Sequence, residues 1–276
     1  MIQRQHHYSM IGSIAAYSVL LACCYAQGAK TIRINDSRPV IEALRRLEDM
    51  YGWQMTYEDP PYESEKDLVD LSDANFIREH QGRRLIGPRS APFDFRFSIP
   101  LDGTTPDQDA VLQDLIRAHG TSGNAGIFAI GRTGAISHIE PTRLVTKQGQ
   151  TITVHSILDA PISFPRARRT SLETLQLLLS AINAQATAKV ATGMLATSVL
   201  ARVTSDEGPH EESAKSVLVR ILDDVNKWSV GIGAGPLHIV WQLTYEPDSK
   251  VYFFNTHTVT VEEKDSSGKV VGRRPI

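Results

Sequence analysis

The sequence has no excess of charge of one sign. Its 29 basic and 31 acidic side chains give a formal net charge of -2 over 276 residues. A protein that binds nucleic acid normally carries a basic excess or a basic stripe that attracts the phosphate backbone. The charge balance therefore excludes nucleic acid from the expected partners. Apolar residues make up 41% of the chain, which is typical of a globular protein.

Motifs that identify a catalytic centre are missing or incomplete. No Gly-x-Ser-x-Gly elbow occurs. His210-Glu211-Glu212 begins like the helix of a zinc protease, but Ala214 stands where the second histidine is needed. Gly231-x-Gly233-x-Gly235 leads through Pro236 into a predicted strand, whereas a phosphate-binding loop leads into a helix. The sequence thus identifies no catalytic, cofactor-binding or metal-ligating residue, and we expect no cofactor.

Some histidines and carboxylates in predicted strands leave the question of a site open. His138 and Glu140 alternate on one face of a predicted hairpin and would need a third metal ligand from elsewhere; His257 has the same status. We expect these residues and His210 to be solvated, so that alanine at any of them changes stability little. An enzyme remains an alternative, because catalytic groups gathered from distant positions leave no local signature.

The first 29 residues have the layout of a secretory signal peptide. Arg4 precedes a mostly apolar run over residues 10–24, and small residues follow as far as Ala29. The run is short for a membrane span and has no basic stop after it. We therefore expect an exported protein, either periplasmic or anchored in the envelope, with secretion as a further alternative.

Cysteine is scarce, since Cys23 and Cys24 are the only two and both lie in this first segment. Leu20-Leu21-Ala22-Cys23 resembles the lipobox of bacterial lipoproteins, in which the cysteine is acylated, so Cys23 is a candidate for lipidation. Cleavage after Ala26 fits the sequence equally well and would leave a mature protein without cysteine. A disulfide framework is excluded in both cases.

One stretch of six residues occurs twice. Trp53-Gln54-Met55-Thr56-Tyr57-Glu58 returns as Trp241-Gln242-Leu243-Thr244-Tyr245-Glu246, with leucine for methionine as the only change. Each copy follows a predicted amphipathic helix, so a helix, a short break and a strand form a unit that is used twice. We expect the two tryptophans to occupy equivalent positions, each packed against the helix before it.

Periodicity and capping residues predict an α+β fold of two related modules, residues 30–150 and 151–261, followed by a flexible tail over residues 262–276. Each module is expected to be a small mixed β-sheet packed by two helices, with βαβ-like units. Expected helices span residues 39–51, 105–119, 170–182 and 211–225. Expected extended segments span residues 31–34, 53–58, 91–100, 127–130, 135–139, 151–164, 188–193, 241–246 and 251–261.

The first unit resembles a known family. Ser37-Arg38-Pro39-Val40-Ile41-Glu42-Ala43-Leu44 and Gly52-Trp53-Gln54-Met55-Thr56-Tyr57 are similar to the short N-terminal domain shared by secretins and TonB-dependent transducers. The resemblance covers roughly residues 31–75, and again residues 205–261 if the repeat is counted. Members of this family are small βαβ modules that work in the periplasm by binding other proteins. The resemblance thus implies a free or lipid-anchored protein-binding module.

Two functions follow as hypotheses. The first is a non-catalytic adaptor module of the cell envelope whose partner is another envelope protein. The alternative is an envelope hydrolase or carbohydrate-binding protein with a site in the cleft between the two modules. An exposed sheet edge favours the first hypothesis, whereas histidines and carboxylates that converge in a concave pocket favour the second.

Overall fold

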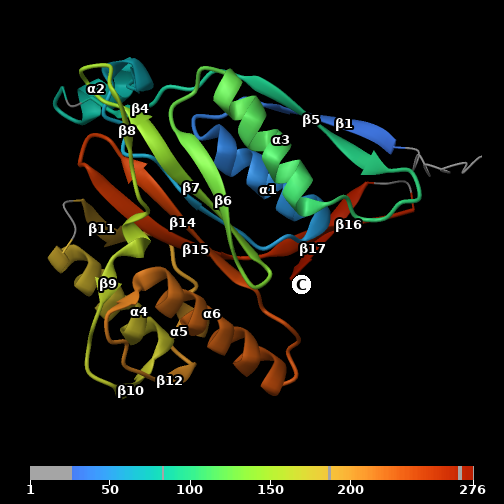
Figure 1. Ribbon diagram of the computed structural model, residues 1–276, viewed down its shortest axis with the longest axis vertical. Coiled ribbons are helices and arrows are strands. Elements are labelled where there is room, and N and C mark those ends of the chain that lie inside the picture. Colours follow the sequence, from blue (N-terminus) through green and yellow to red (C-terminus); the bar gives the residue numbers. More distant parts are fainter. Residues whose placement is uncertain (1–26, 83, 186–187, 267–268, 276) are drawn as a thin grey trace, which may run out of the picture.

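The computed structural model describes residues 27–82, 84–185, 188–266 and 269–275 (Figure 1). These residues form a mixed α+β fold, which confirms the predicted fold class. The lipidation candidate Cys23 and most of the expected signal segment lie outside the described residues. Within the described ranges, no helix is both long enough and apolar enough to cross a bilayer.

Helices are interspersed among the strands in the described residues. The helices are α1 (Pro39–Tyr51), α2 (Ala74–Glu79), α3 (Gln108–Thr121), α4 (Ser171–Gln185), α5 (Thr197–Leu200) and α6 (Ala214–Gly231), with short 3-10 turns η1 (Glu65–Asp67) and η2 (Ile157–Asp159). The strands of the central sheet are β2 (Met55–Glu58), β6 (Ile127–Thr133), β7 (Ile136–Val145), β8 (Thr151–Thr153), β11 (Lys189–Thr192), β14 (Ile239–Glu246) and β15 (Val251–Thr258). The remaining strands form pairs outside it: β1 (Gln27–Ile34) with β5 (Phe93–Pro100), β3 (Leu68–Asp70) with β4 (Ile86–Pro88), β9 (Pro161–Ile162) with β13 (Glu212–Ser213), β10 (Ala167–Thr170) with β12 (Thr204–Glu207), and β16 (Thr260–Lys264) with β17 (Val270–Pro275).

Local signals in the sequence account for the ends of these helices. Pro39 opens α1, where its missing N–H is not needed, and Gly52 ends it with a left-handed φ of 69° and an N–H bond to Glu48. Asp107 caps α3 by accepting the Ala110 N–H at 2.7 Å, so this helix begins later than the expected residue 105. The predicted positions of the four long helices are confirmed.

The two halves of the chain contribute to one sheet. Its strand order is β11-β15-β14-β2-β7-β6, and β8 pairs with β7. The strands that carry the two copies of the repeat, β2 and β14, are neighbours and run parallel at the place where the halves meet. The division into two modules at residue 150 stays a prediction, but the sheet is continuous across it.

The two copies face opposite sides of this sheet. In the register of β2 and β14, Tyr57 lies beside Gln242 and Glu58 beside Leu243, an offset of three residues between the copies. Because side chains alternate along a strand, an odd offset turns equivalent residues to opposite faces. Tyr57 accordingly packs in one hydrophobic cluster and Tyr245 in the other.

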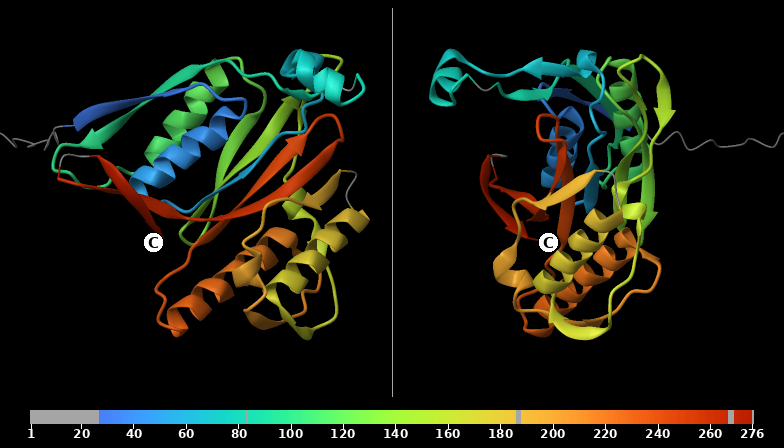
Figure 2. Two further views of the ribbon diagram at one scale, coloured as in Figure 1. Left: turned by 180° about the vertical axis from the view of Figure 1, so that it is seen from behind. Right: turned by 90° about the vertical axis from the view of Figure 1, so that its left-hand side faces the viewer.

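Each face of the sheet carries its own core (Figure 2). On one face α1 and α3 lie between the sheet and the β1–β5 ribbon, and their core includes Trp53, Phe95 and Leu112. On the other face α4 and α6 pack on the sheet, with Trp241 and Phe254 in the core. Each tryptophan lies in the same cluster as the helix that precedes it.

Some segments differ from expectation. Residues 151–164, expected to be extended throughout, hold the turn η2 between the short strands β8 and β9. Residues 65–88, where no helix or strand was expected, contain the β3–β4 pair and α2. The described residues after Glu262, expected as a flexible tail, form most of the β16–β17 ribbon, so that expectation is corrected. The ribbon lies against α1, where Arg273 pairs with Asp49 at 2.7 Å. Its strands carry few apolar residues, so their pairing had no strong periodic signal in the sequence.

Candidate functional site

His138 is buried, which corrects the expectation that it is solvated. Its side chain is held by Thr56 Oγ1 at 2.7 Å and Thr133 Oγ1 at 3.0 Å, and its ring stacks on Trp241. The residue is only 2% exposed because its face of β7 lies toward α6. Burial, with a smaller effect of the nearby Lys215 charge, lowers the pKa of His138 to about 4. His138 is therefore neutral at physiological pH and belongs to the core.

Glu140, two residues further along β7, forms an ion pair that joins the two halves of the chain. Lys215 on α6 lies 2.7 Å from a Glu140 carboxylate oxygen and 2.8 Å from Asp159 Oδ1. Burial opposes the charge on Lys215, but hydrogen bonds from these two carboxylates hold its pKa above the ordinary value. The cluster is thus paired internally.

His257 and His210 lie in different surroundings. His257 Nε2 on β15 lies 2.8 Å from Glu48 Oε2 on α1, and Glu48 itself is buried. His210 is exposed, as expected. In the part of the chain that the structure describes, no three His, Cys, Asp or Glu side chains are grouped to hold a metal ion.

Glu58, at the end of the first repeat copy, is a buried carboxyl group that the sequence did not single out. It is 2% exposed; one oxygen bonds the Ser156 hydroxyl and the other accepts the Ile157 N–H at 2.9 Å. Burial raises the pKa of Glu58 to about 8, so the group is largely protonated at neutral pH. Ser156 also accepts the Leu158 N–H at 3.1 Å. Glu58 therefore fixes the start of η2 against the sheet.

A cavity of about 420 Å³ opens beside Glu58. It is lined from both halves of the chain, by Glu58 and Pro141 on one side and by His155, Asp159 and Tyr252 on the other. A protonated carboxyl group in such a cavity is able to donate a proton. The only local sign in the sequence is an acidic residue at a strand position, which does not reveal what covers it.

Asp59 ties the two repeat copies together. The residue is fully buried, and its carboxylate accepts four bonds: from Arg38 Nε (2.8 Å), the Tyr57 hydroxyl (2.8 Å), the Tyr62 hydroxyl (2.9 Å) and the Tyr245 N–H (2.9 Å). Every donor comes from a different part of the fold: the residue before α1, the end of β2, the loop after it and β14. The arrangement is that of a structural anchor.

The β11 edge of the central sheet is covered at Val190 by a side chain. Asn183 of α4 accepts the Val190 N–H at 2.7 Å and donates to the Val190 carbonyl at 2.8 Å. Its amide thus takes the place that a neighbouring strand would have. Natural sheets commonly protect their edges in such ways, because unpaired backbone groups attract further strands.

The β6 edge is open. Ser137 donates its N–H to the Gln54 carbonyl at 3.0 Å, on the β2 side, and therefore turns its backbone groups away from β6. Arg132, its partner in the register, must then point its own N–H and C=O outward, and so must Ile130 two residues before. Among the residues that the structure describes, none hydrogen-bonds these outward groups. The sequence predicted the hairpin but could not show which edge stays free.

Comparison with protein-family models, with curated proteins and with solved structures found no match.

Proposed function

We propose that this protein is a non-catalytic binding module of the cell envelope that takes up an extended segment of another envelope protein as an added strand along β6. The observation that carries the proposal is the contrast between the two sheet edges. Asn183 satisfies the outward groups of Val190 on β11, whereas those of Ile130 and Arg132 on β6 have no partner in the described chain. An added strand supplies the missing hydrogen bonds.

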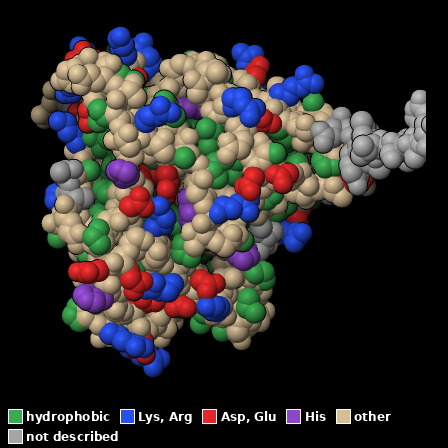
Figure 3. Space-filling view, in the orientation of Figure 1, with side chains coloured by type: hydrophobic (Ala, Val, Ile, Leu, Met, Phe, Trp, Pro, Cys, Tyr) green, Lys and Arg blue, Asp and Glu red, His purple; other side chains and the backbone are tan. Residues whose placement is uncertain are grey.

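Other features support this proposal. The signal-like first 29 residues favour export, and the resemblance of residues 31–75 to secretin and TonB-associated domains favours a protein partner. On the face seen in Figure 1, Lys and Arg side chains lie among Asp and Glu side chains (Figure 3). Such mixed charge fits recognition through backbone pairing and shape better than long-range attraction to a polyanion.

The test compares Arg132→Pro with Arg132→Ala. Both variants lose the exposed ion pair to Asp109, which contributes no more than about 1 kcal/mol. Only proline removes the outward N–H, and pairing with β7 does not use that group. Capture of envelope proteins by the mature protein should survive in Arg132→Ala and be lost in Arg132→Pro, with both variants folded by circular dichroism. Equal capture by the two variants would refute strand addition at β6.

A second candidate, an envelope hydrolase or carbohydrate-binding protein, is favoured by one observation. Glu58 lines a cavity between the halves, and its pKa of about 8 keeps a proton available at neutral pH. Purified bacterial cell-wall polysaccharide is the test substrate. Release of reducing ends by the wild type and none by Glu58→Gln would support the hydrolase, since glutamine keeps the bonding pattern but has no proton to give. No release by the wild type would contradict it.

A further inference from the structure

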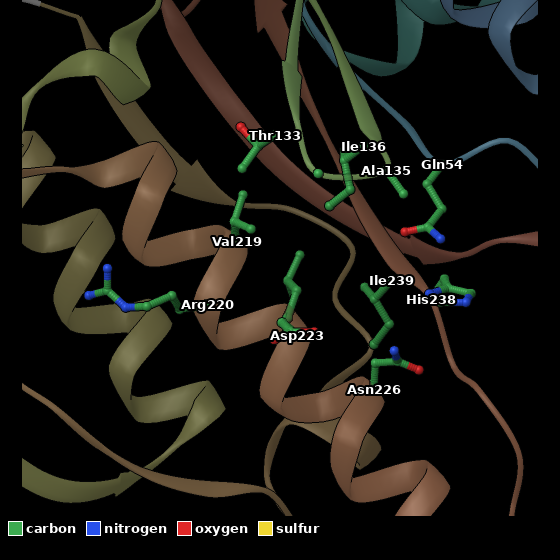
Figure 4. Close-up of a pocket in the computed structure, with 12 residues that line it drawn as sticks. Gln54, Thr133, Ala135, Ile136, Val219, Arg220, Asp223, Asn226, His238 and Ile239 are labelled. Carbon is green, nitrogen blue, oxygen red and sulfur yellow. The ribbon is translucent and has the colours of Figure 1, made fainter. Parts of the chain in front are cut away.

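A second cavity, of about 330 Å³, lies at the end of β6 (Figure 4). The tight turn of the β6–β7 hairpin contributes Thr133, Ala135 and Ile136, and α6 contributes Val219 and Leu222. Gln54, before β2, and His238 and Ile239, at the start of β14, complete the lining. Figure 4 shows Val219 projecting from α6 toward the hairpin. Strand and cavity therefore adjoin at Thr133, which belongs to both.

The face of β6 that leads to this cavity is formed by small side chains. Gly131 lies beside the buried His138 in the register, so its position faces α6. Ala129 and Thr133, two residues away on either side, share that face because side chains alternate. A strand added along β6 would place every second side chain on the same face. The added side chains on that face would lie beside Ala129, Gly131 and Thr133. The side chain next to Thr133 would be the one that adjoins the cavity.

The walls of the cavity are mostly apolar. Some polar side chains at its rim have partners: Asp223 lies 2.6 Å from Lys227 and Asn226 accepts the Leu237 N–H at 3.0 Å. Arg220 pairs with Glu207. Gln54 and His238 add polar groups to the lining, and its apolar part comes from Ile136, Val219, Leu222 and Ile239. In peptide recognition by strand addition, backbone bonds give affinity and side-chain pockets give specificity.

We propose that the segment which pairs with β6 carries one large apolar side chain, such as leucine, methionine or phenylalanine, and that this side chain fills the cavity between the hairpin and α6. The inference rests on the proposed strand addition and adds the sequence requirement of the partner. Burial of such a side chain should raise the affinity about tenfold or more.

The probe is a displayed library of random peptides, selected on the mature wild-type protein. Enriched peptides are then measured on variants. Val219→Phe fills the cavity from α6, and Val230→Phe adds the same bulk on the same helix at an exposed position outside the cavity. Ala135→Phe fills the cavity from the exposed turn, in case phenylalanine at position 219 disturbs the packing. Arg132→Pro and Arg132→Ala report on strand addition.

The expected result is a set of peptides that share one apolar position. Their affinity should fall about tenfold or more on Val219→Phe and Ala135→Phe, stay unchanged on Val230→Phe and Arg132→Ala, and be lost on Arg132→Pro. Peptides that need the outward Arg132 N–H but show no apolar position and bind the filled variants normally would overturn this inference and leave strand addition standing. Peptides that bind Arg132→Pro as well as Arg132→Ala, or no enriched peptide at all, would overturn both.

Discussion

Tyr57 and Tyr245 hold the same place in the two copies of the repeat, and both donate to one carboxylate, Tyr57 through its hydroxyl and Tyr245 through its backbone N–H. The Tyr57 hydroxyl reaches Asp59 Oδ1 at 2.8 Å, and the Tyr245 N–H reaches Oδ2 at 2.9 Å. Asp59 thus connects the two cores at the place where the halves of the chain meet. Because Asp59 bonds to both copies of the repeat, we expect a substitution of this residue to destabilise both halves of the sheet.

Replacement of Asp59 by alanine should lower the free energy of unfolding by about 3 to 5 kcal/mol, because it takes the carboxylate away from Nε of the half-buried Arg38 and from three further donors. Tyr62→Phe removes one donor to the same carboxylate and should cost only about 1 kcal/mol. Urea unfolding measures both. Similar losses for the two variants would contradict the role of Asp59 as anchor.

Glu58→Gln should stabilise the protein in a pH-dependent way. The folded pKa of about 8 lies above the ordinary carboxyl value, so the wild type loses stability as pH rises through the window from about 4.5 to 8, while the unfolded chain releases this proton first. The full loss is on the order of 4 kcal/mol. Glutamine has no such proton and keeps the bonds to Ser156 and Ile157.

The free energy of unfolding of both proteins should be measured from pH 4.5 to 9. The advantage of Glu58→Gln should grow with pH and vanish near pH 4.5. Other titrating groups, His138 included, are common to both proteins and cancel in the difference. A constant difference across this range would show that Glu58 does not hold its proton in the fold.

His138→Ala and His210→Ala should differ sharply in their effect on the stability of the fold. The His138 side chain fills space beside Trp241 and bonds Thr56 and Thr133, so its removal should cost roughly 2 to 4 kcal/mol. His210 is exposed and should change stability by less than about 0.5 kcal/mol. Thermal or urea unfolding of the two variants measures this difference in stability. If His138→Ala left the stability unchanged, the His138 ring would not be buried.

Asn183→Ala should open the β11 edge. The Val190 N–H and carbonyl would lose their partner, at about 1 to 2 kcal/mol in stability, and the exposed edge should promote concentration-dependent association. Gln185→Ala, at an exposed position of the same helix, is the matched control. Analytical ultracentrifugation over a range of concentrations reports the association. An Asn183→Ala protein that stays as monomeric and as stable as the control would rule out edge protection by this side chain.

The sequence by itself determined the local elements. Pro39 and Gly52 mark the ends of α1, and the repeat predicts a strand after α1 and another after α6. These signals act within a few residues along the chain, through fixed φ, missing donors and side-chain periodicity, so they can be interpreted without knowing the neighbours.

Only the tertiary structure decided which strands are neighbours and what covers each face. The offset of three residues between β2 and β14 turned the two copies to opposite sides, and no local pattern specifies a register between segments so far apart. Alternation predicts that Glu58 and His138 share faces with particular residues but not that Ser156 or Trp241 will lie against them. Their protonation states follow from that covering, because burial, not residue type, sets which form is favoured.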